Sequence, residues 1–111
     1  MPTEDEALQV LLADRAVTPV FQPIVDIATG EVVGVEALAR GPVGSVLERP
    51  DAMFAAARRT GRLADLDTLC RVRAVEEAAA AGLAGPLGLF INVEPPTVPT
   101  CLLYTSDAAD E

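Results

Sequence analysis

Histidine, lysine and tryptophan are absent from this chain of 111 residues. Without histidine, neither a Ser-His-Asp nor a Cys-His catalytic arrangement can form within it. Aromatic residues are also scarce, at 4%, so alanine, leucine and valine supply most of the apolar volume. Because 50% of the residues are hydrophobic, we expect one small domain with a packed core rather than a disordered chain.

Positive charge is scarce as well. The chain carries 8 arginines against 17 aspartates and glutamates, for a net charge of −9. An acidic surface is a poor electrostatic partner for a DNA or RNA polymer or for an anionic membrane. A small phosphate ligand could still bind through local arginines or a divalent metal.

Long apolar runs are missing too. No stretch approaches the roughly 18 apolar residues of a membrane-spanning helix, and no basic-then-apolar signal opens the chain. This favours a cytoplasmic location, with a membrane anchor outside this sequence left open. Cys70 is expected to be a small buried hydrophobe, because the spacing of the two cysteines indicates neither a metal site nor a disulfide.

Apolar periodicity and turn residues predict the order helix, strand, strand, helix, helix, strand. The expected ranges are a helix over 3–15, strands over 19–27 and 31–38, a loop over 41–49, a helix from Pro50 to a C-cap at Gly61, a helix over 64–81 and a strand over 87–93. Because only Ala28-Thr29-Gly30 separates the first two strands, they must form an antiparallel hairpin.

The last helix has an expected division of its side chains. Its apolar contacts should come from Leu66, Leu69, Cys70 and Val72. The helix arginines, including Arg71 and Arg73, are expected to be exposed. Their counterparts should be solvated acids: Asp65, Asp67, Glu76 and Glu77.

Glu36 is the most informative residue. It lies near the expected carboxyl end of an apolar strand, on the face that alternation also gives to Val32, Gly34 and Leu38. A carboxylate there must be paired or must hold a metal. A salt bridge with a nearby arginine such as Arg40 is the structural alternative. A glutamate oxygen otherwise suits Mg²⁺ or Mn²⁺.

The same Glu-Ala-Leu tripeptide also begins at Glu6, in a different context. Thr3 lies three residues earlier, which is the spacing of a capping box. Glu6 is therefore expected to begin a helix and to face solvent.

Asn92 ends the last expected strand. Its amide oxygen can bind a hard cation, and a local backbone hydrogen bond is the alternative role. Gly34 is expected to allow another backbone to approach closely.

The stretch Phe21-Gln22-Pro23-Ile24-Val25-Asp26-x-x-Thr29-Gly30-x-x-x-Gly34-x-Glu36-Ala37-Leu38-x-Arg40 closely resembles the opening of the EAL domain. That family contains the bacterial phosphodiesterases of cyclic di-GMP. The resemblance implies an α/β fold, the N-terminal part of a modified (βα)8 barrel with an antiparallel first strand pair. Residues 1–17 would be an N-terminal helix and lead-in, and residues 18–100 a partial EAL domain. Such barrels need about 250 residues, so this chain would supply well under half.

The resemblance also implies roles for individual residues. Glu36 and Asn92 would bind Mg²⁺ or Mn²⁺, and Arg40 would contact a ligand phosphate. Gln22 would line the pocket, and Leu38 would touch a base or, as we favour, fill the core. The chain departs from the family where Glu94 replaces a small polar residue and where Gly41-Pro42 replace an aromatic residue, which predicts a compact loop.

The function implied is hydrolysis of cyclic di-GMP to linear pGpG. The family needs further acidic ligands and a lysine that this chain lacks, so the 111 residues alone are expected to be inactive. The alternative is an inactive relative that acts as a cyclic di-GMP receptor or a protein-interaction module; an unrelated barrel is a weaker reading. A dimer and an upstream sensory or GGDEF domain stay open for the full-length protein.

Residues 101–111 are expected to be a non-native tail. They read Cys-Leu-Leu-Tyr-Thr-Ser-Asp-Ala-Ala-Asp-Glu and closely resemble the in-frame translation of a transposase adapter used in sequencing libraries. A natural, loosely ordered acidic terminus is the alternative. Sequencing an independent genomic clone should show different codons from position 101 onward. Genomic codons that encode all eleven residues would contradict the prediction.

Overall fold

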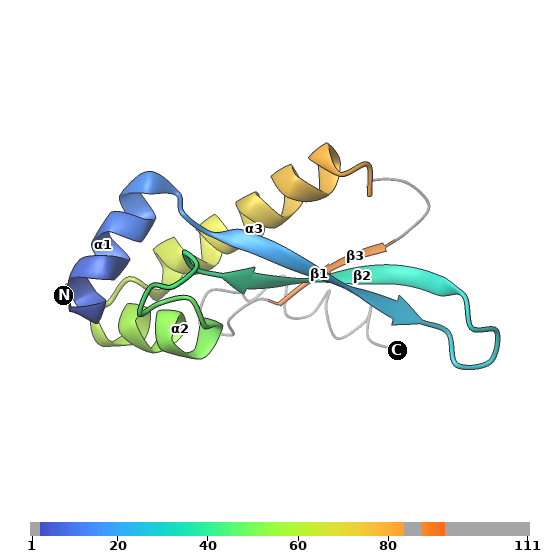
Figure 1. The fold of residues 1–111 in the computed structure, drawn as a ribbon, viewed down its shortest axis with the longest axis horizontal. Coiled ribbons are helices and arrows are strands. Elements are labelled where there is room, and N and C mark those ends of the chain that lie inside the picture. The colour runs from blue at the N-terminus through green and yellow to red at the C-terminus, as the bar shows by residue number, and fades with distance from the viewer. Residues whose placement is uncertain (1–2, 84–87, 93–111) are drawn as a thin grey trace, which may run out of the picture.

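The computed structural model describes residues 3–83 and 88–92. Its elements are α1 (Glu4–Asp14), β1 (Thr18–Val25), β2 (Val32–Arg40), α2 (Pro50–Arg59), α3 (Leu63–Ala80) and β3 (Gly88–Ile91) (Figure 1). This is the order that the apolar pattern predicts. Glu94 and the tail 101–111 lie outside the described residues. Among the helices of the described part, none is long and apolar enough to cross a membrane.

The three strands form one mixed sheet in the order β1-β2-β3. β1 and β2 are antiparallel, as the short connection between them requires, and β2 and β3 are parallel. A parallel pair needs a crossover between its strands, and α2 and α3 provide it. The helix α3 contacts all three strands (Figure 1). The fold is therefore of mixed α/β type.

Helix α1 begins with the predicted capping box. The Glu6 backbone N–H donates to Thr3 Oγ1 at 3.1 Å, and the Thr3 backbone N–H donates to Glu6 Oε1 at 2.9 Å. This second hydrogen bond holds the pKa of the Glu6 carboxyl below its usual value. Glu6 is exposed, so its expected role as a helix-start residue is confirmed.

The main hydrophobic core lies where the three helices meet the loop after β2. Its buried residues are Leu8, Leu11, Val17, Leu47, Met53, Ala56, Ala57, Leu66 and Cys70. Cys70 is buried as expected, and burial, with a smaller contribution from the negative charge of Asp67, raises the pKa of its thiol to about 12. The thiol is therefore protonated at neutral pH.

The division of side chains on α3 differs from the expectation at Val72, Asp67 and Arg73. Val72 is 42% exposed, whereas Asp67 is only 1% exposed. The buried stripe runs through Leu66, Cys70, Ala74 and Ala78, at four-residue spacing. Position 72 falls off this stripe and position 67 falls beside it. Asp67 tolerates burial because Arg71 Nη1 lies 3.1 Å from its Oδ2.

Arg73 was also expected to be exposed, but its side chain is only 18% exposed. Its Nε donates to the backbone oxygen of Val17 at 2.9 Å. Its two terminal nitrogens bind Glu76 at 2.8 Å and Glu77 at 2.9 Å. Arg73 therefore ties α3 to the residues that lead into β1.

We expect the buried side chain of Leu47 to anchor the loop after β2 to the hydrophobic core. It is 1% exposed, so Leu47→Ala in the full-length protein should lower the free energy of unfolding by about 2–5 kcal/mol through the lost burial and the cavity left behind. Urea denaturation measures this. Val43→Ala is the matched control, because Val43 is 92% exposed and its truncation should change stability by at most about 0.5 kcal/mol. Equal midpoints for both variants would contradict the prediction.

Candidate functional site

Glu36 lies at the middle of β2 rather than near its end. The expected strand stopped at Leu38, but the observed strand continues to Arg40, because Thr18 and Pro19 of β1 pair with Arg40 and Ala39. The Glu36 side chain is half-buried. Arg40, and not Glu36, therefore marks the carboxyl end of the strand.

The sheet register places Gln22, Glu36 and Phe90 side by side. Gln22 of β1 is the pairing partner of Glu36 in β2, and Glu36 is in turn the partner of Phe90 in β3. Directly paired residues of neighbouring strands point to the same face of a sheet. Val35 and Ala37 point to the other face and are buried. The face with Glu36 is the open one, with Gln22 and Phe90 exposed.

Glu36 and Asn92 are in direct contact, although 56 positions separate them in the sequence. The Asn92 Nδ2 donates a hydrogen bond of 3.0 Å to Glu36 Oε2. Asn92 directly follows the end of β3, so the parallel pairing of β2 and β3 brings the two side chains together. Within the described residues, neither a salt bridge from Glu36 to Arg40 nor a local backbone bond from the Asn92 side chain is formed.

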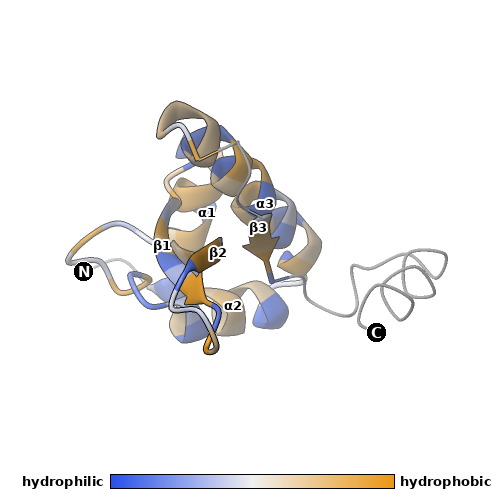
Figure 2. Ribbon diagram, turned by 90° about the vertical axis from the view of Figure 1, so that its right-hand side faces the viewer, coloured by the Kyte–Doolittle hydropathy of each residue, from blue (hydrophilic) through white to orange (hydrophobic). Residues whose placement is uncertain are grey.

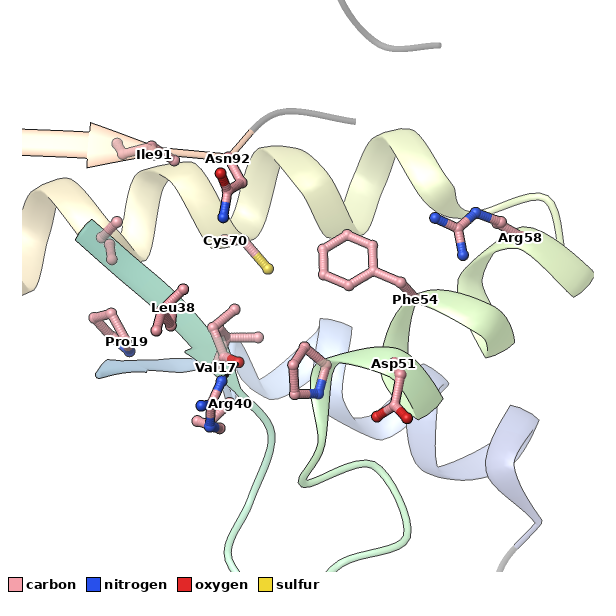
Figure 3. Close-up of a pocket in the computed structure, with 14 residues that line it drawn as sticks. Val17, Pro19, Leu38, Arg40, Asp51, Phe54, Arg58, Cys70, Ile91 and Asn92 are labelled. Atoms are coloured by element: carbon pink, nitrogen blue, oxygen red, sulfur yellow. Dashed lines mark hydrogen bonds between the residues drawn. The ribbon is translucent and has the colours of Figure 1, made fainter. Parts of the chain in front are cut away.

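Arg40, Leu38 and Asn92 border a cavity of about 430 Å³ at the ends of β2 and β3 (Figure 3). Apolar groups line much of the remaining wall, among them Phe54 of α2 and Cys70 of α3. Arg40 is half-buried, and its Nη1 donates to the backbone oxygen of Ala39 at 2.9 Å. Three of the five predicted site residues thus share one cavity, whereas Glu36 and Gln22 lie on the adjoining open face.

Comparison with known proteins decides the family. The sequence profile of the EAL domain matches residues 5–101. The chain belongs to the EAL domain family. It is also similar to the protein named probable cyclic di-GMP phosphodiesterase PdeB of Escherichia coli (strain K12), with 43% identity over 72 residues. That alignment covers 63% of this chain and 14% of the relative.

Glu36 and Asn92 place two oxygen-bearing side chains at one point of this EAL domain. Among the described residues, no group of three or more His, Cys, Asp or Glu side chains could hold an ion. Glu36 and Asn92 nevertheless bring a carboxylate and an amide to one point, and their oxygens are hard donors of the kind that Mg²⁺ and Mn²⁺ prefer. An amide carries its oxygen and nitrogen on the same carbon, so a turn of the Asn92 side chain exchanges one for the other. The pair therefore fits a divalent cation.

Gly34 lets β3 approach β2 closely, as the sequence predicted. A Cβ atom at this position would lie 2.8 Å from the backbone oxygen of Gly88 and 2.8 Å from Cε1 of Phe90. The Phe90 ring fills the space above the glycine. Sequence analysis did not single out Phe90, although period-2 alternation from Asn92 places it on the same face of the strand.

The loop after Arg40 is compact, as expected from Gly41-Pro42. The Gly41 backbone N–H donates to Glu48 O at 3.0 Å, and the Ser45 backbone N–H donates to Pro42 O at 3.0 Å. A Cβ atom on Gly41 would collide with the carbonyl oxygen of Leu47. The loop therefore turns back at once and directs the chain into α2.

Gly34→Ala in the full-length protein should disturb the Glu36–Asn92 contact. The added methyl group would meet the backbone of Gly88, so β3 must move away from β2, at a cost of about 1–3 kcal/mol in the free energy of unfolding. Thermal denaturation and a crystal structure of the variant measure both effects.

Val33→Ala is the control, because Val33 belongs to the same strand and is 48% exposed. The double variant Gly34→Ala with Phe90→Leu should stay destabilised, since the Gly88 oxygen remains in the way. An unchanged melting temperature and an intact Glu36–Asn92 contact in Gly34→Ala would show that β3 is not held by this approach.

Proposed function

We propose that the protein containing this chain is a metal-dependent phosphodiesterase that hydrolyses cyclic di-GMP to linear pGpG. The observation that carries the proposal is the contact between Glu36 and Asn92, 3.0 Å from Nδ2 to Oε2, on one face of an EAL domain. The similarity to a probable cyclic di-GMP phosphodiesterase supports the same substrate.

Glu36 and Asn92 would hold the divalent cation, Mg²⁺ or Mn²⁺. Glu36 supplies the negative charge, and Asn92 supplies a neutral oxygen from a different strand. The parallel pairing of β2 and β3 holds the two side chains at hydrogen-bond distance. When bound, such a cation neutralises charge on the phosphate and lowers the pKa of an attacking water.

Arg40 would bind a phosphate of the ligand. It stands at the end of β2 and borders the cavity that Leu38 and Asn92 also line. A guanidinium group has five N–H donors, and within the part of the chain that the structure describes only Nη1 of Arg40 is engaged, by the Ala39 oxygen. The remaining donors can clamp two phosphate oxygens at once, which is the usual strength of arginine at phosphate sites.

Gln22 and Leu38 would contact the remainder of the ligand. Gln22 stands next to Glu36 on the open face, so its amide can reach a polar edge of a bound nucleotide near the metal. Leu38 lines the cavity with its apolar side chain, which suits contact with a base or packing beneath it.

The chemistry would be completed outside this chain. The three-stranded sheet would be the opening of a modified (βα)8 barrel, with residues 18–100 as the partial EAL domain. In such barrels the catalytic residues come from the ends of several strands. We therefore place the further acidic ligands and the lysine on later strands of the full-length protein.

The two Glu-Ala-Leu tripeptides provide a matched test of the metal assignment. Glu36→Gln in the full-length protein keeps the shape of the side chain and removes its charge, so cyclic di-GMP hydrolysis should fall by at least about a hundredfold. Ligand binding through Arg40 should survive. Glu6→Gln should leave turnover unchanged, because Glu6 caps α1 and is exposed. The measurement is Mg²⁺- or Mn²⁺-dependent formation of pGpG by the parent and both variants.

Two outcomes would overturn these assignments. Equal turnover in the parent and in Glu36→Gln would remove Glu36 from the metal site. If the parent protein binds cyclic di-GMP but does not hydrolyse it at any metal concentration, the protein is a receptor and not an enzyme.

A further inference from the structure

A second cavity, of about 600 Å³, lies between α1 and the loop after β2; we name it the α1 groove. Leu11 and Leu47, at its base, are 2% and 1% exposed. Pro42 and Ser45 form the wall on the loop side. It is distinct from the cavity at Arg40 and shares no lining residue with it. Figure 1 shows α1 beside α2 at the end of the molecule away from the β1–β2 hairpin.

The wall on the helix side is a ridge of three residues, Glu6, Val10 and Asp14. Their spacing of four residues places them on one side of α1, and the ridge is about 12 Å long at 1.5 Å per residue. Val10, at its centre, is 59% exposed. The ridge thus presents an apolar side chain between two carboxylates.

The charge of the groove has one sign. Glu6 and Asp14 line it, and no arginine does. The other acids of α1 are already paired, because Arg59 binds Glu4 at 3.3 Å and Asp5 at 2.6 Å. Within residues 3–83 and 88–92, neither Glu6 nor Asp14 forms a salt bridge. Among the described residues, Glu6 bonds Thr3 at the start of its own helix, and this bond lowers the pKa of its carboxyl.

We propose that the α1 groove binds a cationic amphipathic helix of a partner protein. The apolar face of that helix would lie on Val10 and Pro42, the exposed apolar side chains of the two walls. Two arginines or lysines about two turns apart would reach Glu6 and Asp14, since the two acids are eight positions apart on α1. An amphipathic helix in an apolar groove is a common mode of recognition, and complementary charge fixes its register. The partner would then contact the loop that directly follows Arg40.

Binding of a synthetic helix to the full-length protein tests this proposal. The probe is a fluorescein-labelled, alanine-based peptide of about 15 residues, with a leucine stripe and two arginines eight positions apart. Fluorescence anisotropy should show saturable binding. Asp14→Arg and Val10→Gln should each weaken it by at least about tenfold, since the first replaces an attractive charge with a repulsive one and the second removes the apolar contact without adding charge.

Glu31→Arg is the matched control. It makes the same change of charge as Asp14→Arg at an exposed position of the β1–β2 hairpin, and it should alter the affinity by no more than about twofold. A second probe with glutamates in place of the two arginines should not bind. Asp14 and Val10 are exposed, so both variants should melt at the temperature of the parent, which separates loss of binding from loss of fold.

Three results would overturn the proposal. Equal weakening by Asp14→Arg and Glu31→Arg would mean that only the overall negative charge attracts the peptide. Equal binding of the arginine and glutamate probes would mean that the carboxylates of Glu6 and Asp14 do not recognise the peptide. No binding to the parent would mean that other residues of the full-length protein already fill the groove.

Discussion

The hydrogen bond from Asn92 to Glu36 is the interaction on which the candidate site depends. It joins the end of β3 to the middle of β2, and it exists only because the two strands are parallel neighbours. Parallel neighbours require a crossover, so the chain between them must form α2 and α3 and must pack both helices on the sheet. The contact of 3.0 Å therefore rests on the hydrophobic core that holds those helices.

Two groups that carry no catalytic chemistry keep this arrangement in place. Gly34 allows the backbones of β2 and β3 to approach, because any side chain there would meet Gly88 and Phe90. Arg73 ties α3 to Val17 just before β1, and β1 places Gln22 opposite Glu36. Exposed ion pairs contribute little to stability, about 0–1 kcal/mol each, so the part-buried bonds to the Val17 oxygen and to Glu77 matter more than the exposed pair with Glu76.

Local sequence signals predicted the elements well. The Thr3–Glu6 capping box, the three-residue connection at Ala28-Thr29-Gly30 and the apolar alternation of the strands act over a few residues, and each produced the expected structure. The hydropathy view shows apolar colour on β3 and on much of β2 (Figure 2). The contact between Glu36 and Asn92 was not itself predicted. The sequence indicated each residue separately, and their contact depends on the order of the strands in the sheet.

The errors have physical causes that no local signal contains. β2 continues to Arg40 because β1 supplies partners as far as Thr18, which is a long-range effect. Asp67 is buried because the stripe of α3 uses small residues such as Ala74 and Ala78, whose weak hydrophobicity does not mark the inner face. Arg71 then compensates the buried charge from the next turn of the same helix. A charged residue on an alanine-rich helix is therefore a poor guide to which side faces water.

The two Glu-Ala-Leu tripeptides show how far the fold decides the chemistry. Glu6 binds Thr3 at the start of its own helix, where its carboxylate accepts a hydrogen bond from the backbone N–H of Thr3. Glu36 has no such local donor, because the backbone N–H groups of a central strand are used by the neighbouring strands. Its carboxylate must find a partner in space, and the partner that the sheet supplies is the neutral amide of Asn92. Among the described residues, the partner of Glu36 is thus a neutral amide rather than an arginine, and this is the difference on which the proposed metal role rests.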